Sequence, residues 1–252
     1  MRILLIGGGG VVGTALAMRM RDRHEVTILD VRHVTLPGVS SVVGDANEHE
    51  SLEDLVPAAD AVVHLAAIVP RGAEAARQID AAVRLNVGSV IQALTLSVRE
   101  RVPSFVHISS LSVFQEFGRH PIRAGAVPDA IAPYGLSKRL AEQACAALAA
   151  EPTTVTSLRL AFPAQAGDWP RWRSPSAPEV SGPRTLRLAD RTPYPALHPD
   201  DLTDAVERTL TRRGEYAAIA LAADPRTIDD DTALRLLGWS AQTGRGSVDC
   251  VR

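Results

Sequence analysis

Tyr134 and Lys138 are four residues apart at the start of an expected helix over residues 135–150, so their side chains share one helical face. A tyrosine has an unperturbed pKa of about 10, and a nearby ammonium favours the phenolate and lowers that pKa. Lys138 is the only lysine of the chain, which uses arginine at every other such position. Ser110 ends an expected strand over 104–110 and offers a hydroxyl that could orient the same substrate oxygen. The three residues predict a site of proton transfer.

This pattern becomes specific only through the elements that position it, because Tyr-x-x-x-Lys occurs by chance in many helices. The chain opens with an apolar strand over 2–6, followed by Gly7, Gly10 and Gly13 in a glycine-rich turn. A helix over 14–20 and a strand over 25–30 that ends in Asp30 come next. A dinucleotide site has this order: the glycines let the backbone approach the pyrophosphate at the helix N-terminus, and the acid accepts hydrogen bonds from ribose hydroxyls. A flexible loop or hairpin would account for the glycines alone, but not for the flanking elements.

The remaining elements alternate between strands and helices and predict an α/β fold, a Rossmann-type doubly wound parallel sheet. The expected strands cover 39–43, 60–67, 104–110, 153–160 and 216–222, and the expected helices cover 51–56, 73–99, 135–150, 200–211 and 228–237. We expect a dinucleotide-binding domain with the catalytic residues over 1–162. Residues 163–252 would form a small substrate-binding region, partly packed on that domain. Ligands bind such sheets beyond the carboxyl ends of the strands, which would bring the glycine turn, residues 66–67, Ser110 and Tyr134 together.

Composition excludes several classes of protein. The chain of 252 residues has a formal charge of -2, which argues against a nucleic-acid partner. Two cysteines, Cys145 and Cys250, do not make a disulfide framework, and no secretory leader is recognisable, so we expect a cytoplasmic location. No apolar run approaches the roughly 20 residues that span a bilayer, and no cluster suggests a metal site. The near-exclusive use of arginine suggests a bacterial source.

These motifs resemble the short-chain dehydrogenase/reductase superfamily, in particular its extended, epimerase/dehydratase-like branch. The residues that carry the resemblance are Gly7-x-x-Gly10-x-x-Gly13, Asp30, Gly44-Asp45, His64-Leu65-Ala66-Ala67, Asn86, Ser109-Ser110-x-x-Val113, Tyr134-x-x-x-Lys138 and Leu197-His198-Pro199-Asp200-Asp201. The resemblance is good over residues 1–160 and thin beyond. It implies that Ser110, Tyr134 and Lys138 are the catalytic trio, and that Tyr134 exchanges a proton while a nicotinamide exchanges a hydride at the same carbon. It also implies a homodimer formed through the helices over 73–99 and 134–150.

The expected ligand contacts follow from the motifs and the resemblance together. The residues expected to bind the cofactor are Gly7, Gly10, Val11, Val12, Gly13, Asp30, Asp45, Ala46, Leu65, Ala66, Ala67, Tyr134, Lys138, Phe162 and Pro163. The residues expected to bind a small-molecule substrate are Ile68, Ser110, Ser112, Tyr134, Phe162, Trp169 and Trp172. We expect NAD, because the Asp30 carboxylate repels the 2′-phosphate of NADP. Arg32 and His33 follow it closely and could weaken that preference, so NADP stays the alternative.

Some of these residues also have a purely structural interpretation. Asp45 could face the adenine or only shape a Gly-Asp-Ala-Asn turn, and His64 is better explained as a buried structural histidine than as a ligand. Trp169 and Trp172, with neighbouring arginines, could bind a ring and an anionic group or simply belong to a surface loop.

Differences from the family pattern reduce the number of family reactions that we expect this chain to catalyse. Dehydratases of the family place an acidic pair directly after the catalytic hydroxyl, where this chain has Leu111 and Ser112, so elimination of water is not expected. Phe162-Pro163 replaces the Asn-Pro of many epimerases. The short tail, with Leu237-Gly238-Trp239, is similar to that of NAD-dependent uronate dehydrogenases.

We therefore expect an NAD-dependent oxidoreductase that acts on a secondary alcohol or ketone of a sugar-like or natural-product substrate. A nucleotide-sugar epimerase that retains its cofactor, a non-catalytic NAD-binding regulator and a structural subunit are the alternatives.

Overall fold

The computed structural model describes residues 1–243 except 71, 119, 124 and 175–181. Seven parallel strands form its central sheet, in the order β3-β2-β1-β4-β5-β6-β9. The strands are β1 (Arg2–Ile6), β2 (Glu25–Asp30), β3 (Ser40–Val43), β4 (Ala61–His64), β5 (Ser104–Ser110), β6 (Thr154–Leu160) and β9 (Ala217–Leu221). The order reverses between β1 and β4, and the crevice for a dinucleotide lies at such a switch point. The predicted α/β, Rossmann-like fold is confirmed.

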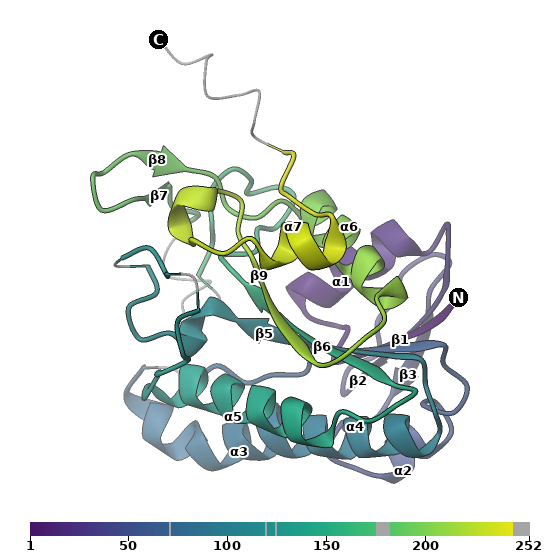
Figure 1. Cartoon of the computed structure of the whole chain (residues 1–252). Coiled ribbons are helices and arrows are strands. Elements are labelled where there is room, and N and C mark those ends of the chain that lie inside the picture. The colour runs from purple at the N-terminus through teal and green to yellow at the C-terminus, as the bar shows by residue number, and fades with distance from the viewer. Residues whose placement is uncertain (71, 119, 124, 175–181, 244–252) are drawn as a thin grey trace.

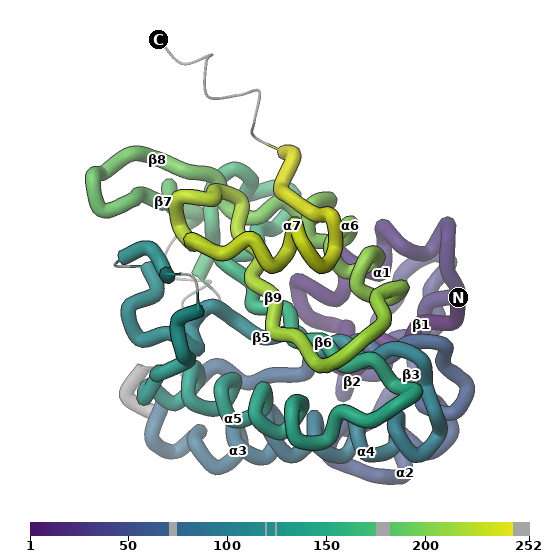
Figure 2. Tube along the Cα trace, viewed as in Figure 1, coloured from purple at the N-terminus to yellow at the C-terminus, as the bar shows by residue number. Residues whose placement is uncertain are grey.

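Helices cover both faces of the sheet, as Figures 1 and 2 show. One layer contains α1 (Val11–Met20), α6 (Pro199–Thr211) and α7 (Thr232–Leu237), and the other contains α2 (Glu50–Glu53), α3 (Ile79–Val83), α4 (Ser89–Arg99) and α5 (Pro133–Leu148). Within β1, Ile3 and Leu5 pack into the core of the first layer, while Leu4 and Ile6 pack into that of the second. The strand reads as a continuous apolar run because both of its faces are buried.

The expected long helix over 73–99 is interrupted in the structure. A 3-10 stretch, η1 (Gly72–Gln78), precedes α3, and a π-helical turn, η2 (Arg84–Gly88), separates α3 from α4. The run Ala75–Arg99 is nevertheless long and apolar enough, by length and composition, to cross a membrane. This differs from the expectation that no apolar run of the chain is long enough. Its most apolar window is 44% buried within the molecule, and α4 packs against α5 and the sheet. A core helix of a globular protein has these properties.

Two other helices differ from the sequence-based expectation. The helix expected over 51–56 with Ser51 as its cap is the single turn α2, and His49 occupies the cap position. The last helix starts at Thr232 instead of residue 228, because Ile228 forms a β-bridge with Ile122. Gly238 ends that helix as predicted, in the left-handed conformation with φ +61°.

The segment after β6 contributes to the same sheet. A small hairpin, β7 (Leu186–Arg187) and β8 (Pro193–Tyr194), stands apart from it, whereas β9 pairs in parallel with β6 and α6 packs on α1. The division at residue 162 into two regions stays a prediction.

Candidate active site

The glycine turn between β1 and α1 contains glycines with two different physical requirements. Gly7 has φ +75°, and a Cβ there would lie 2.4 Å from the Cα of Ala66, just after β4. A Cβ on Gly13 would lie 2.4 Å from the carbonyl oxygen of Gly8. Gly10 is different, because its Cβ would meet nothing closer than the Gly7 carbonyl oxygen at 3.9 Å. Gly7 and Gly13 are therefore required for packing, whereas Gly10 leaves open space that a ligand can enter.

The N-terminus of α1 follows this open space. Gly10 is its cap residue, no side chain caps the helix, and its first turn, which includes Val11 and Val12, contains no acidic residue. The first amide groups of a helix have no intrahelical partner, and the helix dipole favours negative charge at that end. These residues fit a pyrophosphate.

Asp30 lies at the end of β2, 9% exposed, beside the same turn. Its carboxylate accepts hydrogen bonds from the backbone N–H of Gly9 at 2.9 Å and of Arg32 at 3.1 Å. The Arg32 guanidinium lies 3.6 Å from this carboxylate and is mostly exposed. Two ionised oxygens offer about four acceptor positions, so Asp30 can hold the loop and still accept hydrogen bonds from a ribose.

The segments after β3 and β4 line the neighbouring part of the crevice. Asp45 accepts hydrogen bonds from the backbone and side-chain N–H groups of Asn47, both at 2.9 Å, so it shapes a turn whether or not it also contacts adenine. Ala46 is buried. After β4, the backbone N–H groups of Leu65 and Ala66 donate to the carbonyl oxygen of Ile6, and Ala67 is exposed.

A buried asparagine, Asn86 in the η2 turn, joins this crevice to the catalytic helix. Its Oδ1 accepts from the N–H of Ile68 at 2.7 Å, and its Nδ2 donates to the Ile68 carbonyl oxygen and to the Ser137 hydroxyl, both at 2.9 Å. The sequence marked Asn86 only through the family resemblance. The hydrogen bond that links Asn86 to α5 reaches Ser137, which lies 51 residues further along the chain.

The structure brings Ser110 and Tyr134 together at the carboxyl end of β5. Ser110 caps the 3-10 turn η3 (Leu111–Val113), and its Oγ accepts from the Ser112 N–H at 3.1 Å. Burial raises the pKa of Tyr134 to about 12, and a hydrogen bond with Ser110 opposes that rise. A Cβ on Gly135 would lie only 2.1 Å from the Ser112 carbonyl oxygen. Gly135, which the sequence did not single out, therefore lets α5 approach the turn that holds Ser110.

Lys138 is buried, with 2% of its surface exposed, and its Nζ donates to the Ile108 carbonyl oxygen at 2.7 Å. Burial lowers its pKa to about 8, against the opposing effects of Cys145 and Glu142. The expectation that Lys138 lowers the pKa of Tyr134 is wrong for this structure, since that pKa is raised and the opposing hydrogen bond comes from Ser110. The ammonium is directed to the β5 main chain instead.

His64 has the structural function that its sequence context indicated. It is fully buried, and its Nε2 lies 2.9 Å from the Ser89 hydroxyl on α4. Burial lowers its pKa to about 3. A neutral imidazole therefore joins β4 to α4. Among the described residues, no group of three or more histidine, cysteine, aspartate and glutamate side chains could hold a metal ion.

An aromatic wall follows β6. Phe162 has φ +47°, and its ring stacks on Phe117 at 4.7 Å and contacts Trp172 edge-on at 5.0 Å. Pro163 forms a β-bridge with Leu197. The left-handed conformation costs a non-glycine residue about 1–2 kcal/mol, and strain of this kind collects at functional sites.

The two tryptophans expected to bind substrate have different surroundings. Trp172 joins the wall through Phe162, and Arg184 lies 4.9 Å over its ring. Trp169 instead donates from Nε1 to the Ala196 carbonyl oxygen at 3.1 Å, which holds the loop in place. The neighbouring Arg173 forms an ion pair with Asp168 at 2.8 Å, so its charge is balanced within the protein.

A family model for the NAD dependent epimerase/dehydratase family matches residues 3–164, more than half of the chain. The chain belongs to this family. It is accordingly an NAD-dependent enzyme. No curated protein sequence matches the chain significantly.

Solved structures share its fold. MoeE5 in complex with UDP-glucuronic acid and NAD is 20% identical, with a TM-score of 0.74 over 97% of this chain and 95% of MoeE5. UDP-glucuronic acid 4-epimerase from Bacillus cereus in complex with NAD is 18% identical, with a TM-score of 0.70 over 96% and 92% of the two chains. Glucuronic acid dehydrogenase from Chromohalobacter salexigens is 19% identical, with a TM-score of 0.73 over 96% and 84%. At these identities the likeness concerns the fold.

The two positions that follow Ser110 carry no acidic side chain. Leu111 is fully buried, and the Ser112 hydroxyl accepts a hydrogen bond from Ser110 at 3.1 Å. Neither side chain carries the charge that an acid–base pair for water elimination needs.

Proposed function

We propose that this family member is an oxidoreductase that interconverts a secondary alcohol and a ketone on a sugar-like or natural-product substrate. The observation that carries the proposal is the placement of Tyr134, near the start of α5, beside Ser110 at the carboxyl end of β5, close enough for Ser110 to oppose the rise in the Tyr134 pKa that burial causes. The glycine turn and Asp30 lie at the same edge, and their open space fits the pyrophosphate and ribose of NAD. A proton donor and a cofactor crevice thus share one edge.

Ser110 and Tyr134 have distinct parts in this reaction. Tyr134 is a neutral phenol near pH 7, because burial raises its pKa to about 12, and it can donate its proton to the oxygen of a bound ketone. Ser110 donates a second hydrogen bond that holds this oxygen in place. A nicotinamide cofactor held by the glycine turn and Asp30 would provide the redox chemistry, with a hydride passing to this carbon from NADH in reduction and from it to NAD⁺ in oxidation. In the oxidative direction Tyr134 first gives its phenol proton to solvent, and the resulting phenolate then accepts the proton of the alcohol. A positioned acid or base of this kind contributes about 10²- to 10⁴-fold in rate.

Lys138 supports this proton transfer by position. It lies on the same face of α5, one turn after Tyr134. Its Nζ donates to the Ile108 carbonyl oxygen of β5 at 2.7 Å. This hydrogen bond holds the helix that carries Tyr134 at the edge of the sheet where Ser110 lies.

An epimerase that retains its cofactor is the second candidate. The same residues would serve it, and one of the solved structures with this fold is a UDP-glucuronic acid 4-epimerase. Net formation of NADH separates the two reactions, because an epimerase returns the hydride to its substrate. A non-catalytic NAD-binding regulator would bind NAD and need no Tyr134 hydroxyl.

The test begins with the cofactor content of the purified protein and a titration with NAD and NADP. A screen of secondary alcohols with NAD, followed by NADH absorbance, then identifies substrates for kinetics. We expect exchangeable NAD, and Tyr134→Phe should lower kcat about 10²- to 10⁴-fold with NAD affinity unchanged. Tyr216→Phe is the matched control, since the Tyr216 hydroxyl donates to Ser157 in the middle of β6, away from the carboxyl edge of the sheet, and its loss should leave kcat unchanged.

Three results would count against the dehydrogenase. Failure to bind either nucleotide would refute the cofactor site. Full activity of Tyr134→Phe would refute the catalytic assignment. Tightly retained NAD with isomerisation and no net NADH would favour the epimerase.

We further propose that the enzyme is a homodimer of the cytoplasm. Ile79, Val83 and Ile91 on α3 and α4 are each about 40% exposed, and a second copy could cover them. The described cysteine, Cys145, is a buried free thiol, which suits a reducing compartment. Cys250 lies outside the described residues.

A further inference from the structure

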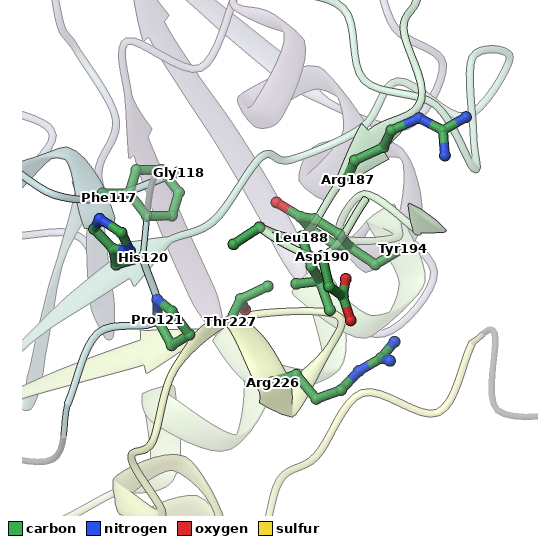
Figure 3. Close-up of a pocket in the computed structure, with 11 residues that line it drawn as sticks. Phe117, Gly118, His120, Pro121, Arg187, Leu188, Asp190, Tyr194, Arg226 and Thr227 are labelled. Atoms are coloured by element: carbon green, nitrogen blue, oxygen red, sulfur yellow. The ribbon is translucent and has the colours of Figure 1, made fainter. Parts of the chain in front are cut away.

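A cavity of about 340 Å³ lies between three segments at one end of the molecule. Phe117 and Pro121 form one side, the β7–β8 hairpin with Leu188 and Tyr194 forms another, and the 3-10 turn η4 (Pro225–Thr227) closes it (Figure 3). This volume is at the lower end of the range for small-molecule sites. The side chains of Phe117, Pro121, Leu188 and Tyr194 make these walls apolar or aromatic.

The charged groups of this cavity balance one another. Arg226 forms an ion pair with Asp224, with Nε to Oδ1 at 3.0 Å, and Figure 3 shows it facing Asp190. Hydrogen bonds from Thr192, and next the charge of Arg226, lower the pKa of Asp190. Arg187 points away from the other lining residues in Figure 3, and its Nη1 donates to the Arg191 carbonyl oxygen at 2.9 Å. The single inward-facing arginine is thus shared by two carboxylates.

This balance decides what the cavity can hold. A diphosphate would face the Asp190 carboxylate, and Arg226, which would have to offset its charge, is already paired with Asp224. Burying a charge without a partner is costly. An uncharged ring would meet none of that cost and would gain apolar contact with Phe117 and Leu188.

The cavity adjoins the candidate active site through the aromatic wall. Phe117 lines the cavity and stacks on Phe162 at 4.7 Å, and Tyr194 contacts Phe162 at 6.4 Å between ring centroids. Phe162 follows β6 directly, and Leu160 of that strand pairs with Ser110. A molecule that reaches from Ser110 along Phe162 arrives at this cavity.

We propose that the cavity binds the part of the substrate remote from the reacting carbon, and that this part is an uncharged apolar ring instead of a nucleotide diphosphate. The inference rests on the proposed function, since it names the substrate class of that site. The Tyr194 hydroxyl supplies one directional polar contact for a substituent on the ring. Burial raises the pKa of Tyr194 to about 12, so the hydroxyl stays neutral and able to donate.

The test uses the full chain with saturating NAD, which keeps other nucleotides out of the cofactor crevice. Calorimetry compares 1-naphthol, an uncharged ring, with UDP. We expect 1-naphthol to bind at least tenfold more tightly than UDP. Leu188→Asp places a carboxylate in the apolar wall and should lower the affinity for 1-naphthol at least tenfold. Arg191→Gln, the matched control, changes an exposed residue of the same hairpin that does not line the cavity, and it should change the affinity for 1-naphthol less than twofold.

Two further variants sharpen the result. Asp190→Asn removes the carboxylate opposite Arg226 and should strengthen UDP binding several-fold. If Leu188→Asp fails to fold, as checked by circular dichroism, Tyr194→Phe replaces it and should weaken 1-naphthol about threefold or more. Tighter binding of UDP than of 1-naphthol to the unmodified protein, or unchanged 1-naphthol affinity in the folded cavity variant, would overturn the inference.

The proposed function fails by different measurements. It is refuted when NAD does not bind or when Tyr134→Phe keeps full activity. Failure of ring binding with NAD binding and Tyr134-dependent turnover intact refutes the cavity inference alone.

Discussion

Alanine at Gly10 and at Gly13 should have opposite effects on NAD binding and on stability. Gly10 is the cap residue of α1, and Gly13 lies in the first turn of that helix, three residues further on. A Cβ on Gly13 would lie 2.4 Å from the carbonyl oxygen of Gly8 and 2.5 Å from the Cα of Gly8. A Cβ on Gly10 has its nearest neighbour at 3.9 Å. The pair therefore separates a glycine needed for the fold from one needed for the ligand.

The expected magnitudes follow from these distances. Overpacking against the backbone costs about 1–3 kcal/mol, and the higher helix propensity of alanine returns up to about 1 kcal/mol, so Gly13→Ala should lose roughly 1–2 kcal/mol. Gly10→Ala should lose no more than about 1 kcal/mol, because alanine is a poorer cap residue than glycine but its Cβ meets no clash. Its methyl group enters the space beside the helix N-terminus, where charge-assisted hydrogen bonds are worth about 1.5–3 kcal/mol. Loss of one such bond weakens NAD about 10- to 100-fold.

Urea unfolding without nucleotide measures the stabilities, and an NAD titration of each folded variant measures the affinities. We expect a stable Gly10→Ala with poor NAD binding and a destabilised Gly13→Ala. NAD affinity unchanged in Gly10→Ala would refute the assignment of the open space to the cofactor. Equal stability losses in the two variants would refute the distinction between the two glycines.

Three further predictions concern the catalytic helix and the assembly. Gly135→Ala would place a Cβ 2.1 Å from the Ser112 carbonyl oxygen, so its free energy of unfolding in urea should fall by about 1–3 kcal/mol. A Cβ on Gly88 meets nothing within 4 Å, so Gly88→Ala should raise the free energy of unfolding by about 0.5–1 kcal/mol. Similar values for the two variants would contradict this packing. Folded Lys138, with a pKa of about 8 against 10.5, releases its proton before the unfolded chain does. The stability of the unmodified protein relative to Lys138→Met should therefore rise between pH 8 and 10, by at most about 1.4 kcal/mol per pH unit, and a flat difference would exclude the buried ammonium. Light scattering should show a dimer that Ile91→Asp converts to monomer, and a monomeric parent protein would rule the dimer out.

Much of the fold was predictable because its signals are local. β1, β2 and β5 have the predicted bounds, since each is a short run of mostly apolar residues between turn residues or polar breaks. The interruption at Arg84–Gly88 was not predictable from helical periodicity. Asn86 lies in that π-helical turn and holds Ile68, and Ile68 is distant in sequence.

The start of α7 shows the same limit. Ile228 looks like the first residue of an apolar helical pattern, but it pairs with Ile122, and the Asp229 N–H donates to the Ile122 carbonyl oxygen at 2.7 Å. A β-bridge across about a hundred residues competes with local helix propensity and prevails. Periodicity alone contains no information about such a partner.

The sequence by itself determined the order of elements, the acid at the end of β2 and the spacing of Tyr134 and Lys138, because each is a local pattern with a fixed geometry in a strand or helix. Only the tertiary structure decided which glycine packs and which faces open space, and that Lys138 bonds the Ile108 carbonyl oxygen while burial raises the pKa of Tyr134. It also decided that Arg226, which lines the cavity, lies near the carboxylates of both Asp224 and Asp190. Steric contact, desolvation and charge balance depend on atoms that come together only when the chain has folded.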